Sequence, residues 1–330
     1  MACSYYDSIP SLYISGAPVR SALKKNENVR QVGFQEMDIP SIVGSFCKYV
    51  KRVLDPKDII YEIDKAVDIA TSGRPGPVVI DLPDDIQRFD IEEKDLRVYK
   101  KDETKTEKKE INKKDFDQFI NLLKKSKRPL VIFGNGVKIS KSGSLCDQLI
   151  EKFKIPYCPT WATFDMFKTS DELNAGSFGV YATRYGNFSI ENSDLLIILG
   201  SRLNGTLTGS NKKEFSSKSK KIQVDIDEFE MNLDDSFEVD IKFNCDVKFF
   251  LEKVIKEDLN LIDYSKWKEK INDWKNKYPI ILEEYKKQTK YVNPYLFFDK
   301  LSDLTKSNDI IIPDASANLF WTYQSYKSNK

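Results

Sequence analysis

The sequence predicts an α/β protein made of doubly wound parallel sheets. Three observations lead to this prediction. Short runs of aliphatic and β-branched residues, such as 77–83 (PVVIDLP) and 194–199 (DLLIIL), have the length of buried strands. Amphipathic helical patterns alternate with these runs, and several runs end in glycine or carboxylate residues where loops should begin. Such strand–loop–helix alternation is typical of open parallel sheets with helices on both faces.

The first third of the chain contains a strand, a helix and a second strand. We expect a short buried strand at 9–15, which Gly16 and Pro18 should break into a loop. Residues 57–71 place apolar side chains at helical spacing, and the SGRPGP turn after them should end that helix with a glycine. The run at 77–83 follows directly, so this region has the pattern of half a βαβ unit.

A charged stretch then separates this region from a second α/β series. Residues 91–115 contain few large apolar side chains, so we place an exposed linker at 96–112. The expected elements after the linker are a helix at 115–127, a strand running into a glycine turn at 129–136, a helix at 142–154, strands at 155–160, 194–202, 220–227 and 239–246, and a helix at 246–255.

The last part of the chain is predicted to be helical and then to begin a third α/β unit. Residues 265–290 place aromatic side chains at helical spacing, which predicts an amphipathic helix kinked before Pro279. A stripe of this kind is more often a packing face than a ligand site. The remaining expected elements are a helix at 293–305 with Asn293 as its N-cap, a strand at 309–314 and a loop at 315–324.

Composition excludes several classes of function. With 52 basic and 51 acidic residues, the chain gives no electrostatic reason to expect nucleic acid or a membrane surface as a partner. It contains no histidine, which excludes Ser-His-Asp and Cys-His triads and histidine-bound metals. Its five cysteines form no CxxC pair, so we expect no disulfide framework, no structural zinc site and a reducing cytoplasm. No apolar run approaches the about 18 residues of a transmembrane helix.

Three strand ends carry residues that could bind a ligand. Gly134 and Gly136 lie between a strand and a helix, where a phosphate could bind, although a plain tight turn explains them more simply. Arg202, two residues after Gly200, could clamp a phosphate or carboxylate, or could form a surface ion pair. Asp225 ends another strand, where it could accept a hydrogen bond from a ribose hydroxyl or cap the next helix.

Longer motifs occur in a fixed order along the chain. They are DSIPSLYISG (7–16), Phe34-Gln35-Glu36, SGRPGPVVIDLPDDIQ (72–87), GSFGVYATRYGNFSIENSDLLIILGSRL (176–203), VDIDEFEM (224–231) and IIIPDASANLFWTYQ (310–324). Together they resemble thiamine-diphosphate-dependent enzymes of the acetolactate synthase type, across nearly the whole chain.

The resemblance implies three α/β domains in the order pyrimidine-binding, central and diphosphate-binding. On that map the chain comprises the C-terminal part of the pyrimidine-binding domain (1–95), the linker (96–112), a complete central domain (113–258), a helical connection (259–291) and the start of the diphosphate-binding domain (292–330). It also implies thiamine diphosphate and Mg²⁺ as cofactors. The implied reaction decarboxylates pyruvate and joins the product to a second 2-oxo acid, in a homodimer or homotetramer.

The resemblance also assigns site residues one by one. Phe34 and Gln35 match the family's Phe-Gln-Glu element and are the candidate catalytic residues. The loop that contacts the cofactor diphosphate in the family matches Ser316, Ala317 and Asn318. The positions that contact flavin in some members match Gly134, Gly136, Gly200, Arg202 and Asp225, so FAD is a further candidate cofactor.

The sequence departs from the family's pattern in several places. Asp84 replaces a lysine that lines the substrate channel in the family, and an Asp-Asp-Arg is replaced by 204–206 (NGT). The family's activating Glu belongs before the first motif, and its metal motif belongs after residue 330. We therefore expect no metal ligand in this chain and no carboligase activity from the chain alone. The alternative interpretation is a non-catalytic nucleotide- or flavin-binding module or subunit.

Overall fold

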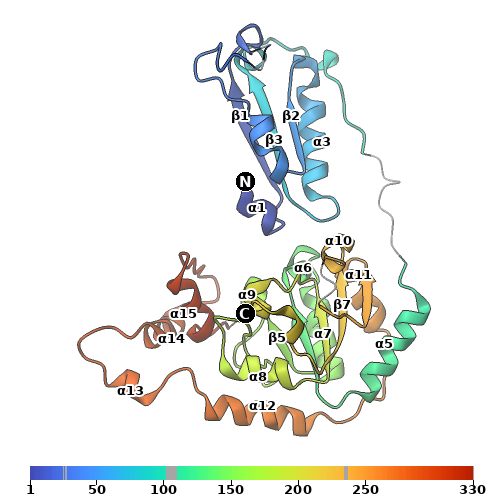
Figure 1. The fold of residues 1–330 in the computed structure, drawn as a ribbon, viewed down its shortest axis with the longest axis vertical. Coiled ribbons are helices and arrows are strands. Elements are labelled where there is room, and N and C mark those ends of the chain that lie inside the picture. Colours follow the sequence, from blue (N-terminus) through green and yellow to red (C-terminus); the bar gives the residue numbers. More distant parts are fainter. Residues whose placement is uncertain (25, 27, 102–109, 234–236, 330) are drawn as a thin grey trace. The chain divides into compact units, whose positions relative to one another are not determined.

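The computed structural model describes residues 1–24, 26, 28–101, 110–233 and 237–329. The chain divides into two compact units, Met1–Glu107 and Lys108–Lys330 (Figure 1). The finer division into five parts stays a prediction. No helix of the described residues is long and apolar enough to cross a lipid bilayer.

The first unit is built on a three-stranded parallel sheet with the strand order β1-β3-β2. β1 (Ser11–Ala17) and β2 (Tyr49–Arg52) pair with opposite edges of β3 (Pro77–Pro83). β3 is buried along most of its length, as expected for a central parallel strand with both faces covered. The remaining elements of this unit are α1 (Ala2–Tyr6), α2 (Ile39–Val43), α3 (Ile59–Thr71) and α4 (Asp84–Gln87).

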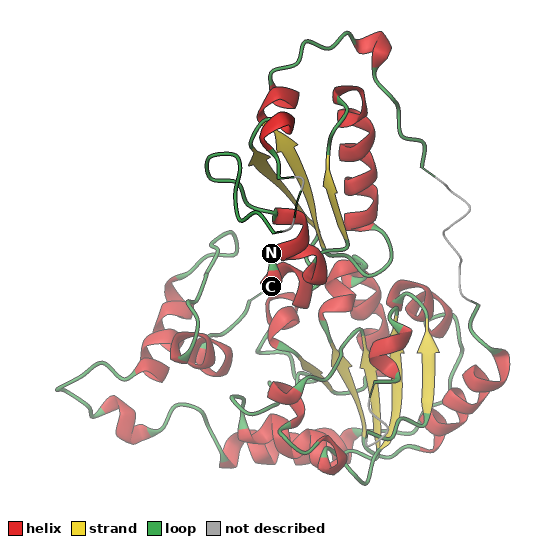
Figure 2. Cartoon of the chain, turned by 45° about the horizontal axis from the view of Figure 1, so that its top comes forward, coloured by secondary structure: helices red, strands yellow, loops and turns green. Residues whose placement is uncertain are grey.

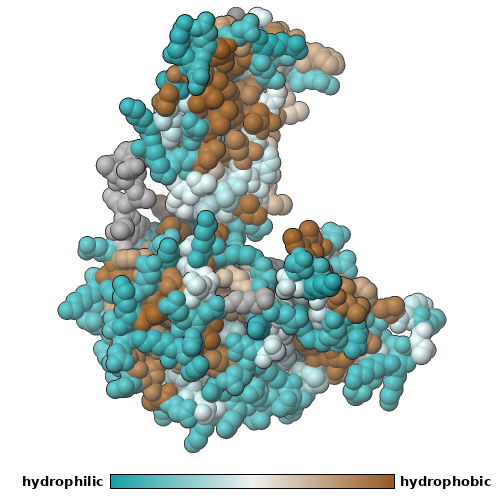
Figure 3. All heavy atoms as spheres, turned by 180° about the vertical axis from the view of Figure 1, so that it is seen from behind, coloured by the Kyte–Doolittle hydropathy of each residue, from teal (hydrophilic) through white to brown (hydrophobic). Residues whose placement is uncertain are grey.

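Helix α3 and β3 supply most of the apolar core of this unit. Ala66 and Ala70 of α3 pack in one cluster with Val78 and Ile80 of β3. Figure 3 shows apolar atoms also gathered on the surface of the first unit. On the edge strand β1, Leu12 is 37% exposed and Ile14 is 59% exposed. The core of the first unit is therefore small.

The sequence-based elements of this unit occur in the structure, with two corrections. The first strand is not buried as predicted, because it lies at the edge of the sheet and leaves Leu12 and Ile14 exposed. The strand at 77–83 and the helix ending at residue 71 are as predicted. Gly73 has φ +55°, the left-handed conformation of a glycine that ends a helix. Gly16 does not break the first strand, because it pairs with Leu82 and keeps the ladder intact up to Ala17.

Part of the predicted linker lies against α3. The guanidinium carbon of Arg97 lies 3.5 Å from the centroid of the Tyr61 ring. Tyr99 donates to the Asp68 carboxylate at 2.8 Å, and the Lys101 ammonium pairs with the same carboxylate at 2.6 Å. Most of these residues are exposed, as the charged composition predicted, while carboxylates and a ring on the outer face of α3 bind their side chains. We call residues 96–101 the strap.

The second unit contains a five-stranded parallel sheet with the order β5-β4-β6-β7-β8 (Figure 2). Between β4 and β6 the direction of strand addition reverses. Right-handed crossovers on the two sides of that point place helices on both faces, which is the doubly wound fold that the sequence predicted. The strands are β4 (Pro129–Phe133), β5 (Tyr157–Pro159), β6 (Leu195–Leu199), β7 (Lys220–Asp225) and β8 (Ile241–Asn244).

Helices cover this sheet and share one apolar core with it. α7 (Gly143–Phe153) contacts α11 (Val247–Val254), and α8 (Arg184–Asn192) contacts α12 (Ser265–Lys277). α5 (Lys113–Lys125) buries Phe116, Phe119, Ile120 and Leu123, which form its apolar face, where a helix at 115–127 was expected. The shorter helices are α6 (Asn135–Ile139), α9 (Gly205–Thr208), α10 (Glu228–Met231) and α13 (Glu283–Lys286).

The amphipathic helix predicted at 265–290 is shorter than expected. α12 ends at Lys277 instead of continuing through a kink. Tyr278 has φ −127° and ψ 61°, because the ring of Pro279 drives the preceding residue out of the helical region. α14 (Pro294–Leu304) then begins as predicted, and the Asn293 side chain accepts from the backbone N–H of Leu296.

Residues 309–314 do not form the predicted strand. Ile310 is 84% exposed and Ile312 is 87% exposed, and neither sheet of the described residues includes this segment. A strand needs a neighbour that pairs with its backbone groups, and an apolar β-branched run cannot supply one by itself.

The segment 315–324, predicted to be a loop, lies mostly in helix α15 (Ala317–Ser325). The Phe320 ring stacks on Tyr181 with ring centroids 3.6 Å apart. Tyr323 is 4% exposed, and its hydroxyl donates to the Pro159 carbonyl at 3.0 Å. Tertiary packing of these aromatic residues supports a helix whose local sequence gives no clear amphipathic signal.

Candidate functional site

Five of the predicted site residues come together at the carboxyl edge of the central sheet. Gly134 and Gly136 follow β4, Gly200 and Arg202 follow β6, and Asp225 ends β7. β4 and β6 are neighbours on either side of the reversal in strand order (Figure 2). In open parallel sheets, ligands bind at such a reversal, outside the carboxyl ends of the strands.

The three glycines allow the loops after β4 and β6 to touch. The N–H of Gly134 donates to the Leu199 carbonyl at 2.8 Å, and the N–H of Gly136 donates to the Gly200 carbonyl at 2.9 Å. A Cβ atom on Gly134 would lie 2.3 Å from the Gly200 oxygen, and one on Gly136 would lie 2.7 Å from the Gly200 Cα. Contact between the two loops thus accounts for these glycines without a ligand, and their role in binding stays a prediction.

Arg202 and Asp225 both have partners within the chain. Arg202 Nη1 lies 3.4 Å from Glu230 Oε1 of α10, and the two side chains are 33% and 22% exposed. Asp225 is 9% exposed, and its carboxylate accepts from the Asp227 N–H at 3.0 Å. The side chain that caps α10 is Asp227, which accepts from two backbone N–H groups of the helix. Asp225 therefore does not cap this helix.

The donor set at this edge fits a nucleotide in part. An arginine that is one-third exposed can bind a phosphate, and a carboxylate at a strand end can accept from a ribose hydroxyl. The segment 225–230 contains four carboxylates, and their negative charge would repel a second phosphate group. The arrangement favours a ligand that offers hydroxyl groups near Asp225 and a single phosphate near Arg202.

Ser316, Ala317 and Asn318 form the start of α15. The first backbone N–H groups of a helix have no acceptor within the helix. The side chain of the N-cap residue Ser316 does not accept from them. Ser316 has φ +73°, a conformation that an L-residue rarely adopts. Both Ser316 and Asn318 are exposed. A phosphate is the ligand that a helix N-terminus of this kind attracts, so these residues fit the predicted contact with a diphosphate.

The position of α15 depends on residues that sequence reasoning missed. Besides the contacts of Tyr323 and Phe320, the Gln324 side chain donates to the Tyr181 carbonyl at 3.0 Å. The N–H of Thr169 donates to the Ser328 carbonyl at 2.9 Å. Burial raises the pKa of the Tyr323 phenol, which stays neutral as a donor. The chain contains 16 tyrosines, and no local pattern marks Tyr323 or Tyr181 among them.

Phe34 and Gln35 lie in the first unit, at the tip of a turn. The Glu36 N–H donates to the Gly33 carbonyl at 3.2 Å, and Gln35 has φ +55°. Phe34 is not among the residues with positive φ, so the turn has the pattern of type II. Phe34 is 87% exposed. The structure thus places the two candidate catalytic residues on a surface turn.

The Glu36 side chain is a further residue that sequence reasoning missed at this turn. Its carboxylate accepts from the N–H of Gly33, three residues before it. No helix begins at Gly33, so this contact is not a helix cap, and no local sequence pattern marks it.

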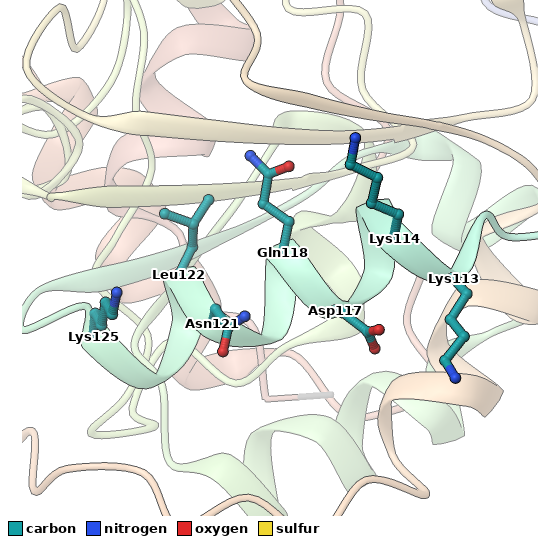
Figure 4. A pocket seen from close by; sticks show the side chains of 7 residues that line it. All are labelled: Lys113, Lys114, Asp117, Gln118, Asn121, Leu122 and Lys125. Atoms are coloured by element: carbon teal, nitrogen blue, oxygen red, sulfur yellow. The ribbon is translucent and has the colours of Figure 1, made fainter.

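The hollow in Figure 4 is separate from these residues. Its lining side chains all come from α5. They are Lys113, Lys114, Asp117, Gln118, Asn121, Leu122 and Lys125. None of the predicted site residues lines it, and its mainly polar lining is typical of the solvent face of an amphipathic helix. In the part of the chain that the structure describes, no three His, Cys, Asp or Glu side chains gather in a way that could hold a metal ion.

Similarity to known proteins covers the whole chain. Residues 116–254 match the family described as thiamine pyrophosphate enzyme, central domain. The chain is 30% identical over 336 residues to acetolactate synthase 2, chloroplastic, of Nicotiana tabacum, covering 100% of this chain and 48% of that protein. It is 28% identical over 342 residues to the acetolactate synthase large subunit of Pyropia yezoensis (99% and 54%). It is 27% identical over 331 residues to that of Lactococcus lactis (99% and 54%). The chain spans about half the length of the curated relatives it matches.

Proposed function

The chain belongs to the thiamine-diphosphate-dependent enzymes of the acetolactate synthase-like family, and from this premise we propose that it is part of a carboligase. The proposed reaction decarboxylates a small 2-oxo acid and joins the product to a second one. The observation that carries the proposal is a similarity to acetolactate synthases that extends over 100% of the chain, beyond the central domain on both sides.

The residues of this chain have specific parts in the proposal. Thiamine diphosphate, bound with Mg²⁺, would supply the electron sink for decarboxylation. The exposed start of α15, at 316–318, would bind phosphate oxygens through its backbone N–H groups. Phe34 would cover the reacting atoms with an apolar ring, and the Gln35 amide would orient a polar group of the substrate. We assign no metal ligand to the described residues.

We also propose an assembly of two or four copies in a reducing compartment. Cys146, Cys158 and Cys245 are buried thiols, which suits a reducing environment. Size-exclusion chromatography with light scattering measures the assembly directly.

Binding of thiamine diphosphate tests the proposal. Calorimetric titration of the purified chain with the cofactor and Mg²⁺ should give saturable binding. Asn318→Glu should weaken cofactor binding about tenfold, because it adds a negative charge where phosphate oxygens would bind. The figure is the order of magnitude for repulsion between two like charges at an effective dielectric constant of about 20. Asn276→Glu on the exposed face of α12 is the control and should bind like the original chain. Absence of saturable binding contradicts the proposal.

An assay of acetolactate formation from pyruvate tests the second part. Since no group of three His, Cys, Asp or Glu side chains that could hold a metal ion gathers among the described residues, we expect cofactor binding without turnover from the chain alone. Clear formation of acetolactate contradicts that expectation.

A second candidate function is a nucleotide- or flavin-binding module. The observation that favours it is that Arg202 follows β6 and Asp225 ends β7, two neighbouring strands, at the carboxyl edge of the central sheet. Titration with FAD, followed by quenching of the flavin fluorescence, should then show saturation that Arg202→Met abolishes. Arg184→Met, at an exposed residue of α8, is the control. Equal effects of both variants, or no saturation, reject this candidate.

A further inference from the structure

The turn at Phe34 presents a large apolar side chain to solvent. Phe34 is 87% exposed, although the nearby surface of the first unit offers apolar groups against which a free ring could pack. A single exposed aromatic side chain is ordinary on a protein surface, so a role for Phe34 depends on whether the turn holds it in place. The question is which group fixes the turn.

The Glu36 carboxylate binds three backbone N–H groups. Its Oε1 accepts from Lys24 at 2.6 Å. Its Oε2 accepts from Val32 at 2.8 Å and from Gly33 at 3.3 Å. One side chain therefore joins Lys24 to Val32 and Gly33, and we call this hydrogen-bonded arrangement of the described residues the loop. Hydrogen bonds to a charged acceptor are the stronger kind, and they lower the pKa of Glu36.

The loop is also packed tightly on the side opposite the turn tip. Gly33 is buried, and a Cβ atom there would lie 2.7 Å from the Pro18 Cβ and 3.1 Å from the Ala22 carbonyl oxygen. Glu36 itself is half-buried. Gly33, the residue before Phe34, is therefore held both by packing and by its hydrogen bond to Glu36. Glu36 itself follows Gln35 directly. The two residues at the tip have little freedom left in their backbone.

We propose that Glu36 is a positioning residue, which closes the loop between Lys24 and Gly33 and thereby fixes Phe34 and Gln35 for contact with the ligand. This rests on the proposed function, in which Phe34 and Gln35 meet the cofactor and the 2-oxo acid. Glu36 acts through the turn and does not touch the ligand itself.

Amide hydrogen exchange tests whether Glu36 closes the loop. In Glu36→Ala, the amides of Lys24, Val32 and Gly33 should exchange on the order of ten-fold faster, and those of the turn tip should follow. Glu36→Gln should be intermediate, because its amide keeps only one acceptor oxygen. Glu93→Gln, at an exposed carboxylate of the same unit, is the control and should leave these amides unchanged. If the amides of α3 exchange at the same rate in all variants, the first unit has not unfolded. Protection that persists in Glu36→Ala overturns the proposal.

A double-variant cycle tests whether the closed loop positions Phe34. Binding of thiamine diphosphate with Mg²⁺ and pyruvate is measured for Phe34→Ala/Gln35→Ala, for Glu36→Gln and for the combination of all three substitutions. If Glu36 acts only through Phe34 and Gln35, the combination should bind no more weakly than Phe34→Ala/Gln35→Ala. Losses that add show that Glu36 has no positioning role. If the original chain does not bind the cofactor, the proposed function fails, and exchange at the turn tip decides the positioning role alone.

Discussion

Ser316 occupies a backbone conformation that its side chain disfavours. Its φ of +73° and ψ of −136° suit glycine, and its side chain makes no capping hydrogen bond to α15. Ser316→Gly should therefore raise the free energy of unfolding of the second unit by about 1 kcal/mol. Urea denaturation followed by circular dichroism measures the change. Ser316→Ala keeps the Cβ atom and should bring no gain, so equal stabilisation by both variants would contradict the strain argument.

Gly136 is required by the contact between two loops. Gly136→Ala places a Cβ atom 2.7 Å from the Gly200 Cα, where only backbone movement can relieve the clash. We expect the free energy of unfolding to fall by about 2 kcal/mol. Gly205→Ala is a matched control, because a Cβ atom there meets nothing within 4 Å. It opens α9 and should be neutral or slightly stabilising. Similar losses in both variants would show that crowding at Gly200 is not the cause.

These glycines also show the limit of sequence reasoning at this scale. The sequence shows Gly134 and Gly136 after a strand. It leaves two explanations for them, a tight turn and a phosphate site. The partner loop at Gly200 lies more than sixty residues away in the sequence. Only the pairing of β4 with β6 places the two loops in contact, so no local pattern could have named it.

At the scale of elements, the strap binds α3 through charged groups that titrate. Hydrogen bonds from Lys101 and then Tyr99 hold the pKa of Asp68 below its usual range. A carboxyl group whose pKa is lower in the folded state stabilises that state above its unfolded pKa, about 3.9 for Asp. This stabilisation is lost as the pH falls through the lower folded value. The strap should therefore be bound at neutral pH and released in acid.

Asp68→Asn tests this prediction. At neutral pH the variant should speed exchange of the Arg97 amide, which donates to the Lys57 carbonyl at 2.9 Å in the bound strap. In acid, the Arg97 amide of the original chain should exchange at a rate close to that in the variant, after both rates are corrected for the intrinsic pH dependence of exchange. Asp64→Asn, at an exposed residue of the same helix, is the control. If the amide exchange rates of the strap are the same in Asp68→Asn and in the original chain at every pH, the prediction is contradicted.

Elements were predicted well where their signal is local. The strands of the central sheet are short aliphatic runs bounded by turns, and each occurs in the structure. Besides the errors at Gly16 and at 265–290, two errors lie at 309–314 and 315–324, where the apolar run has no strand beside it and the predicted loop is helical. Both errors have the same cause, because strand pairing and the packing of aromatic side chains are decided by segments distant in the sequence.

At the scale of the whole molecule, the described residues form two apolar cores that share no residue. The core of the first unit extends only from Val53 to Ile86, whereas that of the second extends from Phe116 to Ile271. Because a small core supports little stability, calorimetry should show two transitions, with the first unit unfolding at the lower temperature.

Variants in each core test this independence. Val78→Ala should lower only the first transition and Ile198→Ala only the second, by several degrees each (about 2–8 °C per kcal/mol, depending on the size of the unit). Each residue is fully buried in its own core, so each variant is the control for the other. A single transition that both variants shift would contradict two independent cores.

The sequence by itself determined the α/β class, the order of the central strands along the chain and the family, because strand runs, helical spacing and motif order are properties of neighbouring residues. Only the tertiary structure decided which glycines touch, that Asp227 and not Asp225 caps α10, that residues 317–325 are helical, and that Glu36 closes the loop behind Phe34. Each of these depends on contacts between segments far apart in the sequence, which form only when the chain is folded.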